Sequence, residues 1–188
     1  MLMTDTKTKP LIILDRDGVI NHDSENYIRC PEDWEPIEGS IEAIAQLSQA
    51  GFRLVVATNQ SGLSRGYFDM GDLAAIHRKM NQAVEDANGH IDAIFFCPHA
   101  DEQNCDCRKP KPGMFLDICS RFDVSPETVL AVGDSKRDIQ AASAAGCQPV
   151  LVLTGNGKKT LKKGELPESV RVFDDLLSFS EHLVDLCD

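Results

Sequence analysis

Two carboxylates follow a short apolar run near the start of the chain. Residues 11–14 (Leu-Ile-Ile-Leu) suit a buried strand, and Asp15 and Asp17 come directly after it with one residue between them. Side chains alternate along an extended chain, so both carboxylates would share one face if the strand continued. Gly18 permits the tight turn that follows. This outlines a reaction centre, although an Asp-Gly pair also closes ordinary hairpins.

Polar residues also follow two later apolar runs. Residues 58–62 (Thr-Asn-Gln-Ser-Gly) come after a predicted strand at 52–57, and Gly133 and Asp134 come after one at 128–132. In open parallel sheets, ligands bind outside the carboxyl ends of the strands. Each segment alone is typical of an ordinary turn or strand end, but together they predict one crevice that all of them line.

The elements that must position these residues are predicted from hydrophobic periodicity. Apolar runs that end in polar, Gly-containing loops alternate with segments of helical period, which is typical of βαβ units around a parallel sheet. The strands are expected at 11–14, 52–57, 91–96, 128–132 and 150–153, with a short sixth near 170–173. The helices are expected at 41–50, 71–87, 114–121, 137–145 and 176–187. The predicted fold is one three-layer α/β/α, Rossmann-like domain that spans 1–188.

Three local features carry further expectations. Ser40 is predicted to cap the first helix. Segment 21–38 is long for a loop, and loops of that length tend to be lids or binding elements. Segment 155–169 is rich in Gly and Lys, so we expect it to be mobile and exposed.

Charge and hydropathy exclude some classes of partner. The 188 residues carry a formal net charge of -11, which would repel nucleic acid and anionic membrane surfaces. No apolar run approaches the roughly 20 residues that a membrane span needs. Residues 1–10 lack the apolar core of a secretory signal, so we expect a cytoplasmic protein. A small anionic substrate stays compatible, because a bound divalent cation supplies local positive charge.

Three cysteines and a histidine lie close together in the middle of the chain. Three thiolates and one imidazole suit a tetrahedral Zn²⁺ site with no open position, so the zinc is expected to be structural and to fold the loop at about 97–107. Buried or disulfide-bonded cysteines are the alternative, which an odd set of seven in a cytoplasmic protein disfavours. The predicted ligands are Cys97, His99, Cys105 and Cys107. The other cysteines, interpreted as packing residues, are Cys30, Cys119, Cys147 and Cys187.

The polar segments resemble, in order, the four motifs of the haloacid dehalogenase-like phosphohydrolases, and the resemblance covers nearly the whole chain. The resemblance implies that Asp15 attacks phosphorus and forms an aspartyl-phosphate. It implies that Asp17 protonates the leaving oxygen and later activates water. A catalytic Mg²⁺ would be held by Asp15, Asp134 and the main-chain carbonyl of Asp17. The matching residues are Asp15-Arg16-Asp17-Gly18, Thr58, Lys109, and Gly133-Asp134 with Asp138.

The remaining motif residues have expected roles around the phosphate. Lys109 would supply a second positive charge, and Thr58 would hydrogen-bond the phosphate oxygens as charge spreads in the transition state. The zinc loop would aim Arg108 and Lys109 into the crevice. Asp138 would either orient a neighbouring group by a hydrogen bond or cap the helix that begins there.

The cysteine and histidine run, followed by Arg-Lys-Pro at 108–110, narrows the resemblance to a zinc-bearing branch of the family without a large cap domain. This branch acts on a sugar bisphosphate or on histidinol phosphate, and residues 109–114 favour the sugar phosphate. Arg108 could bind a second phosphate through two parallel hydrogen bonds. We expect a small-molecule sugar phosphate substrate and a monomer. The residues expected to contact substrate are Asp23, Asn26, Asn59, Gln60, Ser61, Arg108 and Lys109.

A protein of another class is the alternative to an enzyme. A non-catalytic module could bind phosphate on the same zinc-stabilised scaffold. Such a protein would be expected to have lost Asp15 or Asp17, and both are present.

Overall fold

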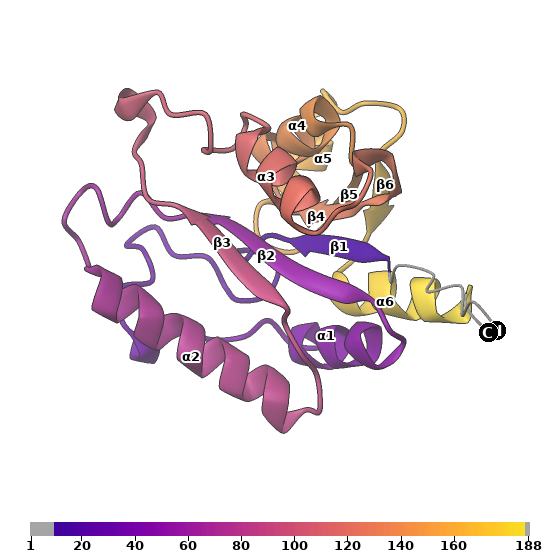
Figure 1. Ribbon diagram of the computed structural model, residues 1–188, viewed down its shortest axis with the longest axis horizontal. Helices are drawn as coiled ribbons and strands as arrows, with labels where there is room; N and C mark the ends of the chain where they lie inside the picture. The colour runs from indigo at the N-terminus through magenta and orange to yellow at the C-terminus, as the bar shows by residue number, and fades with distance from the viewer. Residues whose placement is uncertain (1–9, 187–188) are drawn as a thin grey trace, which may run out of the picture.

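The structure, a computed structural model, describes residues 10–186 (Figure 1). Its centre is a six-stranded sheet in which every neighbouring pair of strands is parallel, in the order β3-β2-β1-β4-β5-β6. This confirms the predicted α/β class. The strands are β1 (Leu11–Leu14), β2 (Arg53–Asn59), β3 (Ala93–Cys97), β4 (Leu130–Gly133), β5 (Gln148–Val152) and β6 (Arg171–Phe173). The α-helices are α1 (Ser40–Gln49), α2 (Met70–Asp86), α3 (Gly113–Arg121), α4 (Lys136–Ala145), α5 (Gly157–Lys163) and α6 (Leu176–Asp185).

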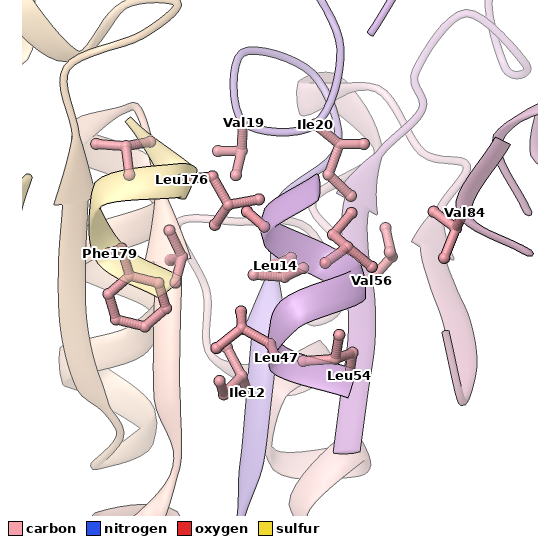
Figure 2. Close-up of a cluster of buried hydrophobic side chains, with 14 of the residues drawn as sticks. Ile12, Leu14, Val19, Ile20, Leu47, Leu54, Val56, Val84, Leu176 and Phe179 are labelled. Atoms are coloured by element: carbon pink, nitrogen blue, oxygen red, sulfur yellow. The ribbon is translucent and has the colours of Figure 1, made fainter. Parts of the chain in front are cut away.

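Helices cover both faces of the sheet, as the three-layer prediction requires. In Figure 1, α1, α2 and α6 lie on one side and α3 and α4 on the other. Alternate residues of β1 supply the two cores: Ile12 and Leu14 join the cluster under α1, α2 and α6, which Figure 2 shows in part. Leu11 and Ile13 join the cluster under α3 and α4. A central strand buried on both faces explains why its sequence is apolar throughout.

The strand order brings the first and fourth motifs together. β1 lies at the centre of the sheet, and the chain runs from it to β2 and β3 on one side before it returns to β4 on the other. Leu14 pairs with Val132, and the N–H of Asp15 donates to the Val132 carbonyl at 2.9 Å. The direction of winding therefore reverses between β1 and β4, and this is where open α/β sheets bind ligands.

Several predicted boundaries are wrong by a few residues. β2 continues through Thr58 and Asn59, which pair with β3, so these residues belong to the strand and do not follow it. β4 begins only at Leu130, because residues 126–128 form a 3-10 helix. The last helix ends at Asp185, and the end of its predicted span at 187 lies outside the described residues.

Ser40 is not the cap of the first helix. Gly39 precedes the helix with a φ of 78°, and Ser40 is already its first residue. The buried Ser40 hydroxyl donates instead to the carbonyl of Ile20 at 2.6 Å. It therefore ties the helix to the loop that follows Asp17.

The prediction of a mobile, exposed segment at 155–169 is wrong for its first half. Residues 157–163 form α5, in which Gly157 and Thr160 are buried. The Thr160 hydroxyl donates to the Asp134 carbonyl at 3.0 Å, and the Asn156 N–H donates to Asp134 Oδ2 at 2.7 Å. This segment is thus part of the wall behind the fourth motif.

The long segment 21–38 folds over the carboxyl end of the sheet and is anchored at two points. Trp34 is buried at 2% exposure. The Lys79 ammonium, on α2, donates to the carbonyls of Pro31 at 2.7 Å and Trp34 at 2.8 Å. The expected binding element is therefore held by side chains at both the core and α2. No helix within the described part of the chain is long and apolar enough to cross a membrane.

Candidate active site

A buried lysine lies at the centre of the predicted crevice. Lys109 is only 2% exposed, and its ammonium nitrogen is 2.9 Å from Asp15 Oδ1 and 2.7 Å from Asp138 Oδ1. The same nitrogen donates to the Ala57 carbonyl at 2.8 Å. An ammonium has three protons, and each has a partner here. The cation is therefore fixed in one position between the ends of β1 and β2 and the start of α4.

Asn59 fixes the main chain of this lysine. Its amide nitrogen donates to the Lys109 carbonyl at 3.0 Å, and its amide oxygen accepts from the Lys109 N–H at 3.1 Å. Both ends of the Asn59 side chain thus bind Lys109, and Asn59 also lines the cavity described below, so its contact with substrate stays a prediction. Asn59 therefore joins the end of β2 to the loop that carries Lys109.

Three buried carboxylates face this single ammonium. Burial, above all, raises the pKa of Asp15 to about 8; Lys109 opposes the shift, and the charges of Asp138 and Asp134 add to it. Burial and Asp138 raise the pKa of Asp134 to about 6. For Lys109, burial acts to lower the pKa, but Asp138 and Asp15 outweigh it and leave that pKa raised. The negative charge of the cluster is thus only partly compensated by the protein itself.

Asp138 fulfils both of the roles between which the sequence left a choice. Its Oδ2 accepts from the Ser135 N–H at 3.0 Å, so it completes the hydrogen bonding at the start of α4. Its Oδ1 contacts Lys109. Burial acts to raise its pKa, but the Lys109 charge and hydrogen bonds outweigh burial and lower it.

The donor set fits a divalent cation that binds oxygen ligands. Carboxylate oxygens of Asp15, Asp134 and Asp138 all lie within 4.8 Å of one another. Both oxygens of Asp138 lie against groups of the protein, Oδ1 against the Lys109 ammonium and Oδ2 against the Ser135 N–H. Asp15 contacts Lys109 through Oδ1 alone, and Asp134 Oδ1 is buried with neither a hydrogen-bond nor an ion-pair partner among the described residues. A Cβ at Gly18 or Gly155 would lie 2.2 or 2.3 Å from Asp134 Oδ2, so only glycine fits on these sides of the carboxylate. Asp15 and Asp134 are therefore the carboxylates available to a Mg²⁺ ion.

The second carboxylate of the first motif lies in a different environment. Asp17 Oδ1 accepts from Arg16 Nε at 3.0 Å and from Asn21 Nδ2 at 2.9 Å, and Asp17 Oδ2 accepts from Gln60 Nε2 at 3.0 Å. Burial acts to raise the pKa of Asp17, but the Arg16 charge and these hydrogen bonds outweigh it and lower the pKa. Gln60 also donates to the Thr58 hydroxyl at 2.9 Å. Gln60, predicted to contact substrate, thus connects Thr58 with Asp17.

An adjoining cavity of about 310 Å³ opens beside Asp17 and is lined by four arginines and four acidic residues. The arginines are Arg16, which binds Asp17, and Arg65, Arg108 and Arg137, of which only Arg108 was predicted to contact substrate. The acidic residues are Asp17, Asp23, Glu25 and Asp101, and Asp101 forms an ion pair with Arg108. Arg137 follows the fourth motif by three residues, and Arg65 lies just after the polar end of β2, so basic residues close to each motif were the signal that sequence analysis missed. Of the predicted substrate residues, the cavity is lined by Asp23, Asn59, Gln60, Ser61 and Arg108.

Two predicted substrate residues have other positions. Asn26 does not line this cavity but a neighbouring surface hollow, with Arg29 and Asp33. Lys109 lies beneath the cavity among the carboxylates, where its contacts are with Asp15 and Asp138.

The four predicted zinc ligands lie together at the base of the loop after β3. The Sγ atom of Cys97 is 3.3 Å from that of Cys107 and 3.6 Å from that of Cys105. His99 Nδ1 is 3.4 Å from Cys107 Sγ. Ligands at about 2.3 Å around a tetrahedral zinc ion lie about 3.8 Å from one another, so the group is compact enough to hold one.

The other cysteines divide into two groups. Cys119 and Cys147 are buried in the core under α3 and α4, as predicted for packing residues. Cys30 is half-exposed at the start of a 3-10 helix, so the packing interpretation does not apply to it. Cys187 lies outside the described residues. The cysteines of the described part of the chain form no disulfide.

The fold and this site define a haloacid dehalogenase-like hydrolase, and the chain belongs to that family. The family model described as HAD-hydrolase-like matches residues 106–179. A D-glycero-beta-D-manno-heptose-1,7-bisphosphate 7-phosphatase from Bordetella bronchiseptica is 55% identical over 174 residues, which are 93% of this chain and 97% of that protein. A protein of the same name from Neisseria meningitidis is 53% identical over 93% of this chain and 94% of its own length.

A solved structure is similar over the same extent. It is the D,D-heptose 1,7-bisphosphate phosphatase from B. bronchiseptica complexed with magnesium and phosphate. It superposes with a TM-score of 0.93 at 54% identity and covers 94% of this chain and 99% of its own. The likeness extends through the sheet, both helical layers and the segments that carry the site.

The two hydrogen bonds between Asn59 and the main chain of Lys109 give a prediction about turnover. Replacing Asn59 by Ala should lower kcat at least about tenfold on a small aryl phosphate, with little change in KM, because Lys109 loses its fixed position. Steady-state kinetics with p-nitrophenyl phosphate measure this, and Gln82→Ala, which removes an exposed amide paired with Asp86 on α2, is the control. An Asn59 variant that keeps full kcat on the aryl phosphate but loses activity on a sugar phosphate would instead support direct substrate contact.

Proposed function

We propose that this chain is a Mg²⁺-dependent phosphatase that removes the 7-phosphate of D-glycero-beta-D-manno-heptose 1,7-bisphosphate. The observation that carries the proposal is the pairing of two regions that could bind phosphate: the Asp15, Asp134 and Lys109 cluster, and the adjoining cavity, which four arginines line together with four acidic residues. A bisphosphate has one anionic group for each region. The 55% identical relative with this activity supports the same substrate. The reaction would serve the synthesis of nucleotide-activated heptose.

In the first step, Asp15 is the nucleophile. A carboxylate oxygen of Asp15 forms a bond to phosphorus while the bond between phosphorus and the leaving oxygen breaks, and that oxygen takes a proton from Asp17. The products of this step are the dephosphorylated alcohol and an aspartyl-phosphate at Asp15. Lys109 offsets the charge that the incoming phosphate brings to Asp15, and Thr58 donates to a phosphate oxygen.

In the second step, Asp17 acts as a base. A water molecule gives a proton to the Asp17 carboxylate, and the water oxygen attacks phosphorus while the bond from phosphorus to Asp15 breaks. Inorganic phosphate leaves, and both aspartates return to their starting forms. The lowered pKa of Asp17 suits this step, because it favours the carboxylate that accepts the proton.

The cation would be held by Asp15, Asp134 and the main-chain carbonyl of Asp17. When bound, Mg²⁺ supplies positive charge to a nucleophile and a substrate that are both anionic. It would also favour the ionised form of Asp15, whose pKa burial has raised to about 8.

The guanidinium cavity supports the sugar bisphosphate over histidinol phosphate. Histidinol phosphate has one phosphate, so it leaves the arginines of this cavity without a second phosphate as a partner. A second phosphate instead gains charge-assisted hydrogen bonds there. A non-catalytic phosphate-binding module would not need a nucleophile. Here the Lys109 ammonium is held 2.9 Å from Asp15, the proposed nucleophile, which supports an enzyme.

Substrate preference tests the proposed function. We expect kcat/KM for the heptose bisphosphate to exceed that for histidinol phosphate about 100-fold, because a charge-assisted contact contributes about 1.5 to 3 kcal/mol. Release of inorganic phosphate from both compounds, side by side, measures this ratio. Equal or reversed preference would reject the substrate assignment. Asp15→Asn is the control, since it should remove turnover of both compounds while the circular dichroism spectrum stays unchanged.

We also propose that Cys97, His99, Cys105 and Cys107 hold a structural zinc ion. The loop from 98 to 112 extends away from the sheet in Figure 1 and contributes little to either core cluster. A metal ion could supply the folding energy that such a loop lacks. The loop ends at Arg108 and Lys109, so its fold determines where both cations lie. A monomer in the cytoplasm stays our proposal for assembly and compartment, in keeping with free cysteines in the described chain.

Removal of one zinc ligand gives the matching prediction. Cys105→Ser should lose zinc, lower the melting temperature and reduce kcat at least about tenfold even at saturating Mg²⁺, because Lys109 is less well placed. Metal analysis by mass spectrometry and calorimetry measure the first two effects. Cys30→Ser, outside the loop, is the control and should retain zinc and activity. Wild-type protein that contains no zinc, or a Cys105 variant with unchanged kcat, would contradict the proposal.

A further inference from the structure

Arg16 is a buried charge for which the two-step reaction has no task. Its exposure is 1%, which is lower than that of Asp15, and it lies between the two reactive carboxylates in the sequence. Burying a guanidinium is costly unless a carboxylate and hydrogen bonds compensate it. A sequence that keeps such a group beside a reactive centre needs a physical reason for it.

The Arg16 guanidinium contacts both oxygens of the Asp17 carboxylate. Arg16 Nε is 3.0 Å and Nη2 is 2.9 Å from Asp17 Oδ1, and Nη2 is also 3.1 Å from Asp17 Oδ2. Because a guanidinium is planar and rigid, such a fork fixes the orientation of the carboxylate as well as its position. The main-chain N–H of Arg16 donates to Asp15 Oδ1 at 2.7 Å. One residue therefore contacts both reactive carboxylates, one through its main chain and the other through its side chain.

The remaining nitrogen of the Arg16 guanidinium, Nη1, contacts a side chain of helix α2. Arg16 Nη1 lies 3.4 Å from His77 Nε2, on α2. The His77 ring packs against Phe96 of β3, with centroids 6.3 Å apart. Burial and the Arg16 charge lower the pKa of His77 to about 4, so its ring is neutral at pH 7 and Nε2 can accept from Arg16. The guanidinium is thus held from behind by an element outside the first motif.

We propose that Arg16 is the positioning residue for proton transfer to the leaving group: its guanidinium, braced by His77, fixes the Asp17 carboxylate in the orientation that reaches the leaving oxygen. The inference rests on the proposed function, in which Asp17 gives that proton. Arg16 itself acts only through Asp17. Asn21 and Gln60 contribute one further hydrogen bond each to the same carboxylate.

The dependence on the leaving group separates this role from a structural one. A sugar alkoxide leaves poorly without a proton, whereas nitrophenolate is stable unprotonated at neutral pH and needs none. The second step, in which Asp17 is the base, is the same for both substrates, but kcat/KM reports the first step, in which the leaving group departs. A misplaced Asp17 should therefore lower kcat/KM far more for a sugar phosphate than for p-nitrophenyl phosphate. General loss of structure would slow both to the same extent.

The experiment compares Arg16→Lys with the wild type on both substrates. Lysine keeps the charge but lacks the planar fork. We expect kcat/KM for the sugar phosphate to fall about 100-fold and kcat/KM for the aryl phosphate to fall less than about fivefold. Arg121→Lys, an exposed ion pair with Asp117 on α3, makes the same substitution away from the site and should leave both rates unchanged.

Equal losses of kcat/KM on the two substrates would overturn the proposal. If Arg16→Lys does not fold, Gln60→Met tests the proposal in its place, because Gln60, just after β2, donates a hydrogen bond to Asp17 Oδ2. A loss selective for the sugar phosphate in that variant supports positioning of Asp17 from its surroundings, and a uniform loss rejects it. Failure of the proposed substrate is separable, since it would be seen in the wild type, and the comparison can then use any alkyl phosphate that the wild type hydrolyses.

Discussion

The structure depends on an electrostatic imbalance at the carboxyl ends of β1 and β4. Three buried carboxylates meet one buried ammonium, Lys109, and no other cation of the described residues lies within ion-pair distance of Asp15, Asp134 or Asp138. Like charges at this separation in a desolvated site oppose one another strongly. A divalent cation and an anionic substrate together complete the balance. The fold thus holds a set of charges that are balanced only when the cation and the substrate are bound.

The neighbouring elements can be understood as supports for that cluster. Asn59 holds the main chain of Lys109, and Gly18 and Gly155 leave room around the Asp134 carboxylate. The hydroxyl of Thr160 binds the Asp134 carbonyl from α5. None of these residues needs to touch substrate, yet each fixes an atom that does chemistry.

The two aspartates of the first motif have opposite environments, although one residue separates them. Burial and neighbouring carboxylates raise the pKa of Asp15, whereas Arg16 lowers that of Asp17 against burial. Pairs of carboxyl groups with diverging pKa values are typical of sites where one group is a nucleophile and the other exchanges protons. An approaching phosphate dianion would raise the pKa of Asp17 and so help it to hold the proton that the first step requires.

The parallel sheet, both helical layers and the residues around Lys109 could be predicted from the sequence, because apolar periodicity and strand-end motifs are local signals. The partners of those residues could not be predicted. Asn59 and Gln60 line the cavity, where their contact with substrate stays a prediction, but their partners within the protein, Lys109 and Asp17, come from other parts of the chain. Nothing in the sequence around Arg16 shows that its side chain binds Asp17. The composition of segment 155–169 indicated mobility, since nothing local shows that its first half packs behind Asp134.

Mg²⁺ titration of the wild type, Asp134→Asn and Asp138→Asn by calorimetry tests the central claim most directly. Asp134 has a buried oxygen available to the cation, whereas Asp138 is bonded to Lys109 and Ser135. We expect Asp134→Asn to abolish measurable binding, and Asp138→Asn to weaken it about tenfold through displacement of its neighbours. Asp134→Asn protein that binds Mg²⁺ as tightly as the wild type would show that Asp15 and Asp134 share no ion.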